Sequence, residues 1–185
     1  MERVKKEGID NLSKFAFKEW YAIVKAIGLG RQKILLRKGG IHEGKRGFEL
    51  LSETFWLFPT FFHQQLEKLK PEIGLKFIPD AGQTIPLQYY CHALSCGWLD
   101  TEKNLRRIDE NHFWTRDCIS DKFGWGSKNG VYWIELGVYK LPNPIWIAMR
   151  PKYKGCKSWI EIEDDNINQV VRNNLSEVHF TGTGI

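Results

Sequence analysis

A glycine-rich basic segment in the first quarter of the chain carries residue types that suit phosphate binding. The segment RKGGIHEGKRG contains four glycines together with Arg37, Lys38, His42, Lys45 and Arg46. Phosphate binding needs backbone N–H groups that can turn toward oxygen atoms, together with cations, and such a loop offers both. The spacing and the Lys-Ser/Thr ending of a Walker A loop are missing. The segment therefore predicts a phosphate-contacting loop, with an ordinary exposed loop as the alternative.

A second group of residues places aromatic rings next to an imidazole and an amide. It comprises Trp56, Phe58, Phe61, Phe62, His63 and Gln64, with Thr60 between them. Such a set can stack on a base and bond to its edge, which is how unpaired bases are read. Core packing is the stronger explanation for Trp56 and Phe58. We nevertheless assign Trp56, His63 and Gln64 to a candidate base pocket, with Thr60 among the binding residues.

The cysteines do not form a metal-binding pattern. Cys91 and Cys96 have four residues between them, at the edge of metal-ligand spacing, whereas Cys118 and Cys156 stand alone. Because no second closely spaced pair exists, buried free thiols are the preferred interpretation. We expect neither a metal ion nor a cofactor.

Three enzyme classes lack residues that they require. A Nudix hydrolase needs a helix dense in glutamates, and the helix expected over 60–69 offers only Glu67. A restriction-type nuclease needs Asp/Glu-x-Lys on a strand, and the candidate strands carry no lysine at that offset. A thiol hydrolase needs a cysteine near a histidine, but the neighbours Cys91 and His92 would point to opposite faces of a strand. Whether the protein is an enzyme stays open.

The excess of positive charge is concentrated at the beginning of the chain. The formal net charge is +5, and residues 1–50 contain twelve Lys and Arg against six Asp and Glu. The remaining residues are nearly neutral. A local cationic surplus favours an anionic partner, because phosphate contacts release counterions. The alternative is that these charges only keep an exposed helix and loop in solution.

The phosphate-binding candidates are expected between a helix and the elements that follow it. Apolar residues at intervals of three, four and seven predict an amphipathic helix over 12–27, ended by Gly28 and Gly30. Residues 33–37 (KILLR) indicate a short buried strand, and residues 38–47 form the loop. Thus the cations of the loop should lie at the end of a buried strand.

The aromatic group is expected at the end of the second strand. Residues 54–58 (TFWLF) predict a strand stopped by Pro59, and Thr60 is expected to cap a helix through Leu69. Later patterns predict strands over 87–99, 131–141, 145–149 and 153–162, and helices from 100 or 101 to 108 and from 115 to 122. These elements indicate an α+β fold around a small, strongly curved mixed or antiparallel sheet.

Composition limits the class of protein. The 185 residues are 42% hydrophobic and 26% charged, as in an ordinary globular chain. We expect a single domain over 1–185, frayed at 1–11 and 181–185. No apolar run reaches the ~18 residues that a membrane span needs. The basic beginning has no apolar stretch behind it, and four cysteines fit reduced thiols, so a cytoplasmic location without membrane contact is expected.

Several segments resemble a family of uncharacterised cytosolic bacterial and archaeal proteins, the domain-of-unknown-function 1802 family. The matching stretches are Phe17–Ala26 (FKEWYAIVKA), Leu36–Ile41 (LRKGGI), Phe55–Gln64 and Tyr153–Trp159 (YKGCKSW). Together they span most of the chain. This resemblance implies no established activity.

A shorter pattern is similar to the ASCH group of PUA-like domains. Gly30, Gln32 and Arg37 follow a helix and run into a strand, where that group has glycine, lysine and arginine at the same offsets. Gln32 replaces the lysine, and Leu35 stands where the group usually has glutamate, so a catalytic role of that glutamate does not carry over. The resemblance implies a small PUA-like barrel with flanking helices, a class that mostly binds RNA or modified nucleotides.

Together these observations predict a nucleic-acid or nucleotide-binding module. The residues expected to bind are Gly30, Gln32, Arg37, Lys38, His42, Lys45, Arg46, Trp56, Thr60, His63 and Gln64. Two alternatives stay open: a metal-dependent hydrolase or nuclease-like enzyme, and a protein-interaction module that uses exposed aromatic rings. The sequence does not indicate an oligomeric state.

Overall fold

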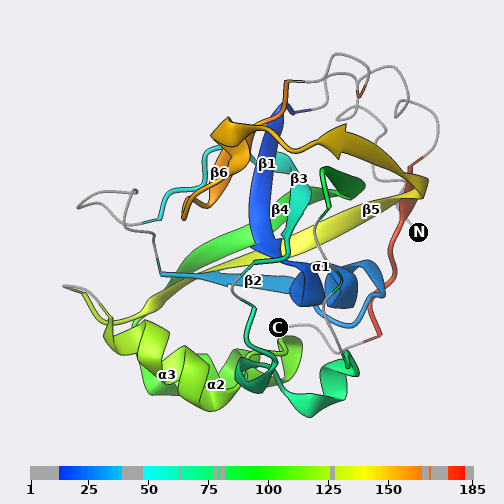
Figure 1. The fold of residues 1–185 in the computed structure, drawn as a ribbon. Helices are drawn as coiled ribbons and strands as arrows, with labels where there is room; N and C mark the ends of the chain where they lie inside the picture. Colours follow the sequence, from blue (N-terminus) through cyan, green and yellow to red (C-terminus); the bar gives the residue numbers. More distant parts are fainter. Residues whose placement is uncertain are drawn as a thin grey trace.

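The computed structural model describes residues 13–38, 48–62, 64–76, 79, 82–125, 128–163, 167 and 175–181. Among them, seven strands form one sheet, accompanied by three α-helices (Figure 1). Four predicted binding residues, His42, Lys45, Arg46 and His63, lie outside the described residues. None of the described helices is long and apolar enough to cross a membrane.

The strands and helices alternate irregularly along the chain. The strands are β1 (Phe15–Trp20), β2 (Ile34–Arg37), β3 (Thr54–Thr60), β4 (Thr84–Leu99), β5 (Val131–Ala148), β6 (Trp159–Glu161) and β7 (Ser176–Glu177). The helices are α1 (Tyr21–Gly28), α2 (Glu102–Ile108) and α3 (Arg116–Gly124). One-turn 3₁₀ helices add Leu66–Lys68, Pro71–Ile73, Asp109–Asn111 and Pro151–Tyr153.

The sheet is mixed and its described strands do not close into a barrel. Its order is β2-β5-β4-β3-β1-β6, with β7 paired to β5. Only the β1–β3 pair among these is parallel. The long strands β4 and β5 pair along most of their length and shift register between Leu87 and Tyr89 and between Ala93 and Ser95. Such irregularities bend a strand pair, and Figure 1 shows β5 turning back across the view. The α+β fold and the curved mixed sheet are confirmed, and the sheet formed by the described strands is open.

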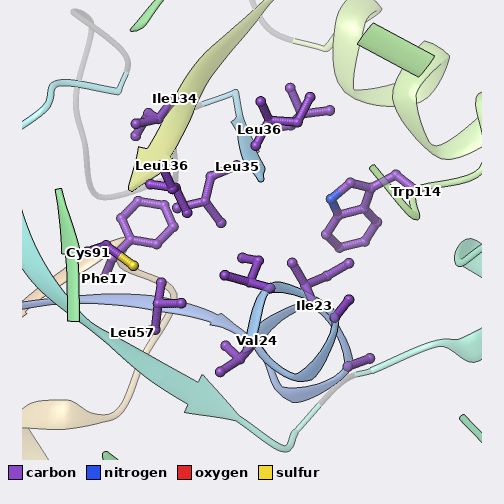
Figure 2. Packing of buried hydrophobic residues seen from close by; sticks show 14 of the residues in the cluster. Phe17, Ile23, Val24, Leu35, Leu36, Leu57, Cys91, Trp114, Ile134 and Leu136 are labelled. Atoms are coloured by element: carbon purple, nitrogen blue, oxygen red, sulfur yellow. The ribbon is translucent and has the colours of Figure 1, made fainter. Parts of the chain in front are cut away.

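Hydrophobic residues cover both faces of the sheet. Along β3, Phe55 and Leu57 belong to a large cluster with α1, and Trp56 and Phe58 belong to a second cluster on the opposite face. This alternation follows from the two-residue period of a strand. Figure 2 shows the larger cluster, in which Phe17 packs beside side chains from β2, β3 and β5.

The first predicted helix is wrong in its first half. Residues 15–20 form β1, and the helix α1 begins only at Tyr21. The apolar spacing misled because β1 lies between β3 and β6 and is buried on both faces, with Ala16 in one cluster and Phe17 in the other. A strand buried on both faces gives an apolar run that also fits a helix.

The helix predicted over 60–69 is also wrong. Strand β3 continues through Pro59 to Thr60, paired in parallel with β1, and only the turn Leu66–Lys68 is helical. Pro142 and Pro144 likewise do not interrupt β5. The strand over 33–37 and the two later helices are confirmed, and Thr101 and Thr115 each accept a capping hydrogen bond from a backbone N–H.

Gly30 ends α1 in a conformation that only glycine adopts easily. Its φ angle is 70°, and a Cβ atom built there would lie 2.1 Å from the backbone oxygen of His179. Its own carbonyl accepts a hydrogen bond from the N–H of Thr181. Gly30 therefore allows the end of the chain to pack against the exit of α1.

We predict that Gly30→Ala destabilises the protein by about 3 kcal/mol, because the left-handed φ and the backbone clash both oppose folding. Gly74 has nearly the same φ, 72°, and its nearest atom to an added Cβ lies 3.9 Å away. Gly74→Ala should therefore cost only about 1 kcal/mol. Urea denaturation of both variants measures the difference; equal losses would show that the His179 contact is unimportant.

Candidate functional site

Arg37, the last residue of β2, connects two strands that are far apart in the sheet. β2 and β1 are separated by β5, β4 and β3 in the strand order. The Arg37 guanidinium nevertheless donates a hydrogen bond to the backbone oxygen of Lys18 on β1, and lies 3.5 Å from a carboxylate oxygen of Glu19. The curvature of the sheet thus brings the end of β2 against β1.

The Glu19 carboxylate is fully buried at this junction. Its side chain has 0% exposure, and its Oε1 accepts a hydrogen bond from the Trp20 N–H. Its Oε2 and the Nε of Arg37 have no hydrogen-bond partner among the described residues. Arg37 also lies over the ring of Phe17, with 4.6 Å between the guanidinium carbon and the ring centroid. A buried ion pair of this kind is costly to break, because each charge depends on the other for compensation.

Beside this junction lies a cavity of about 600 Å³. It is formed by the second half of β1, the end of β3, the end of β2 and the loop 154–158. Its lining residues are Lys18, Glu19, Trp20, Arg37, Phe58, Pro59, Thr60, Phe61, Phe62, Met149, Tyr153, Lys154, Gly155, Cys156, Lys157 and Ser158.

The cavity exists because β1 loses its neighbour on one side. β6 pairs with β1 as far as Phe17, and one further hydrogen bond joins the Lys18 N–H to the oxygen of Ser158 at 2.8 Å. Beyond that point the loop leaves the strand edge. The Lys18 ammonium then holds the loop by donating to the oxygens of Tyr153, at 2.8 Å, and Gly155, at 2.7 Å.

Positive charge dominates the lining. The lining contains four cations, Lys18, Arg37, Lys154 and Lys157, and a single carboxylate, that of Glu19. This carboxylate is already paired with Arg37. Burial lowers the pKa of Lys18, and the nearby charge of Lys157 lowers it further. An anion in the cavity would relieve this repulsion between like charges.

Aromatic rings form the other part of the wall. The ring of Phe61 stacks on Tyr21, with 5.0 Å between centroids, and Trp20 packs on Trp114 at 4.8 Å. Phe62 is different because it is 62% exposed. An exposed ring at the edge of a cationic cavity offers a stacking surface.

The structure brings some predicted residues to this cavity. Arg37 and Thr60 both line it, and the Thr60 hydroxyl donates to the backbone oxygen of Glu19 at 3.1 Å. Gln64 lies just beyond, with its amide bonded to the oxygen of Thr60 and to the N–H of Ala22. Gln64 therefore helps to fix the end of β3.

Other predicted residues lie elsewhere. Trp56 is 1% exposed and belongs to the core, as core packing suggested. The Gln32 amide is buried, donating to the oxygen of Ile34 at 2.8 Å and accepting from the N–H of Phe113 at 2.9 Å. The Lys38 ammonium donates to backbone oxygens that include those of Phe123 and Gly130. These three side chains hold the fold and do not line the cavity.

Within the described residues, the thiols and the possible metal ligands do not form a second candidate site. Cys91 and Cys118 are buried and free, and Cys96 and Cys156 are exposed and free. Burial raises the pKa of the Cys91 thiol. No group of three His, Cys, Asp or Glu side chains in the described ranges is arranged to hold a metal ion.

The sequence prediction missed most of the cations in the cavity. Lys18 and Glu19 interrupt the apolar run FAFKEWYAIV, and charged residues inside a buried run are a sign of special interactions. Lys154 and Lys157 belong to the segment YKGCK, where two lysines flank a glycine and a cysteine in a short loop. Both signals were available, but the first was hidden by the incorrect helix over 12–27.

We predict that Arg37→Met destabilises the protein by about 3–5 kcal/mol, because it leaves the Glu19 carboxylate buried without a counter-charge. Adding Glu19→Gln to this variant should restore about 1–3 kcal/mol, because the uncompensated charge is removed. Denaturant unfolding of both single variants and the double variant gives the coupling energy.

The exposed pair between Arg106 and Glu102 on α2 provides a matched control. Arg106→Met should leave stability almost unchanged, because exposed ion pairs contribute little. If Arg37→Met changed stability as little as Arg106→Met, or if Glu19→Gln restored none of the lost stability, the Arg37–Glu19 ion pair would not stabilise the contact between β2 and β1.

Solved structures with a similar fold are known. ASCH from Zymomonas mobilis aligns with a TM-score of 0.52 at 13% identity, covering 86% of this chain and 94% of that one. Two single-residue mutants of the same protein align similarly, with TM-scores of 0.53 and 0.51 at 12% and 14% identity, covering 86% of this chain and 95% and 97% of theirs. At this identity the likeness concerns the fold alone, and at the level of the fold it confirms the resemblance to ASCH domains.

Sequence comparison gives a second, independent result. No match was found among curated proteins. The profile of a family described as a domain of unknown function (DUF1802) matches residues 16–183. Because this match covers nearly the whole chain, the chain belongs to the DUF1802 family.

Proposed function

We propose that the cavity beside Arg37 binds a nucleotide, either free or as one unit of a single-stranded nucleic acid. The observation that carries the proposal is the charge of the lining, which holds four cationic side chains and one carboxylate that is already ion-paired. A phosphate group supplies the missing negative charge, and phosphate contacts dominate the affinity of proteins for nucleic acids.

The available cations lie on the outer loop. Lys154 is exposed and Lys157 is partly buried, and neither ammonium has a hydrogen bond or ion pair with a described residue. By contrast, Lys18 already donates to two carbonyl oxygens. Lys154 and Lys157 are therefore the first contacts for a phosphate, and Lys18 and Arg37 provide the positive potential behind them.

The volume of the cavity and the exposed ring at its edge agree with a nucleotide ligand. Ligand cavities in proteins usually measure roughly 300–1,000 Å³, and this one, at about 600 Å³, falls within that range. Phe62 offers the face on which a base stacks. The ASCH-like fold agrees with the nucleic-acid or nucleotide ligand that the resemblance to PUA-like domains implies. The predicted loop cations His42, Lys45 and Arg46 follow β2 in the chain, and we propose them as additional phosphate contacts.

The direct test is binding of labelled single-stranded RNA and DNA and of the four 5′-mononucleotides, measured over a salt series. We expect log K for the strands to fall linearly with log salt, since counterions are released. Removing two phosphate contacts with Lys154→Gln/Lys157→Gln should lower that slope by about 1.4, at ~0.7 per contact on a single strand. The matched control Lys103→Gln/Arg107→Gln removes two exposed charges from α2, outside the cavity, and should leave the slope unchanged.

The aromatic contact is tested separately. Phe62→Ala should weaken binding about tenfold, because base stacking contributes about 1–3 kcal/mol per base. Trp146→Ala removes an equally exposed ring on β5 and should have no effect. No binding at low salt, or a K that does not depend on salt, would reject the proposal. A stable oligomer without nucleic-acid affinity would instead favour the protein-interaction alternative.

A further inference from the structure

A second hollow lies on the other side of Arg37. It measures about 310 Å³ and is lined by Leu36, Arg37, Lys38, Asp121, Lys122 and Trp125. These residues come from the end of β2 and from the end of α3, which Figure 1 shows below β2 in the view. Because Arg37 lines both hollows, the two are neighbours with one guanidinium between them.

Lys122 differs from the other two cations of this second hollow, because its described contact is with an aromatic ring and not with an oxygen atom. Its ammonium lies 3.7 Å from the ring centroid of Trp114 and has no hydrogen bond or ion pair with any described residue. Lys38, in contrast, donates to carbonyl oxygens of residues 123 and 130. Lys122 is therefore a second cation of this hollow beside Arg37, the residue that lines both hollows.

The electrostatics of Lys122 support an anion at this boundary. Burial lowers the pKa of Lys122, and the charge of Arg37 lowers it further, while Glu19 acts in the opposite direction. Glu19 is the carboxylate already paired with Arg37. One additional negative charge placed between Lys122 and Arg37 would stabilise both cations.

Trp125 gives the second hollow a stacking surface of its own. Its side chain is 53% exposed. Trp125 follows directly after the last residue of α3, and its backbone N–H donates a hydrogen bond to the backbone oxygen of Lys122 at 3.4 Å. An indole face accepts any base by stacking, and the Asp121 carboxylate in the same lining can accept a hydrogen bond from a base amino group. Each hollow thus has its own exposed aromatic ring.

We propose that the two hollows together bind two consecutive nucleotides of a single strand, with the linking phosphodiester at Arg37 and Lys122. The first nucleotide occupies the larger cavity near Phe62, and the base of the second stacks on Trp125. This inference rests on the proposed function of the larger cavity and identifies the ligand as a strand with unpaired bases.

The sizes and charges favour a dinucleotide unit over two separate nucleotides. The second hollow has about half the volume of the first, which suits a base and sugar more than a complete nucleotide with its own phosphate. Arg37, which lines both hollows, and Lys122 in the second hollow are placed where one phosphate can link the two nucleotides. Bases that enter separate hollows cannot be paired in a duplex, so the ligand class is single-stranded.

The test compares the four 5′-mononucleotides with the four corresponding dinucleotides carrying a 5′-phosphate, by calorimetric titration of the full chain. We expect the best dinucleotide to bind at least about tenfold more tightly than its mononucleotide, because it gains a stacked base. Trp125→Ala should remove this gain and leave mononucleotide affinity unchanged. Lys122→Met should weaken dinucleotide binding in the same selective way, because it removes a phosphate contact.

The controls separate this inference from the function on which it rests. Trp146→Ala, which removes an exposed ring outside both hollows, should change neither affinity. If mononucleotides bind and depend on Phe62, but dinucleotides bind no better or ignore Trp125, the two-nucleotide inference is overturned and the proposed function survives. If no mononucleotide or dinucleotide binds, the two-nucleotide inference is rejected, and the proposed function is rejected with it when the longer single strands also fail to bind. Thermal unfolding of each variant confirms that the chain remains folded.

Discussion

The contact between Arg37 and β1 is the constraint on which the rest of this structure depends. The sheet is open, and three strands separate β2 from β1 in its order. The two strands meet through the hydrophobic cluster that holds Phe17 and Leu35 and through one polar contact at the end of β2. In that polar contact, the Arg37 guanidinium donates to the backbone oxygen of Lys18 and pairs with the buried carboxylate of Glu19. Because a buried carboxylate without compensation is very unfavourable, the curvature of the sheet and the pairing of these charges stabilise each other.

The same contact explains why hollows occur where they do. Arg37 lines both hollows at the end of β2, where its guanidinium reaches the backbone of β1. On one side, the edge of β1 separates from the loop 154–158, which the Lys18 ammonium holds at a distance. On the other side of Arg37, the end of α3 contributes Lys122 to the lining of the second hollow. Structure and site are thus parts of one arrangement, in which cations that support the fold also create an attractive potential for anions.

Much of the architecture could be predicted from the sequence. The strand over 33–37 and the helices capped by Thr101 and Thr115 were recognised because caps and short apolar runs are local signals. β1 was missed because a strand buried on both faces has no alternating pattern, and its apolar residues happened to continue the spacing of α1. The helix expected after Pro59 failed for a tertiary reason, since pairing with β1 extends β3 through the proline.

The site was harder to predict than the fold. Arg37 and Thr60 were identified, the first from its place after a buried strand and from the ASCH resemblance, and both line the cavity. Gln32 and Lys38 were assigned to binding from their residue types, yet backbone groups distant in sequence occupy their side chains. Lys157 and Trp125 could not be linked to Arg37 from sequence, because the sheet curvature that brings them together depends on long-range pairing between β4 and β5.

The most direct measurement is a two-dimensional NMR titration of the isotope-labelled protein with a 5′-mononucleotide. Binding in the larger cavity predicts saturable shifts concentrated at the backbone amides of Lys18, Phe62, Gly155 and Lys157, which surround it. Shifts that cluster on the exposed part of β5 around Trp146, or no saturable shifts at millimolar nucleotide, would contradict the claim that this cationic cavity is the binding site.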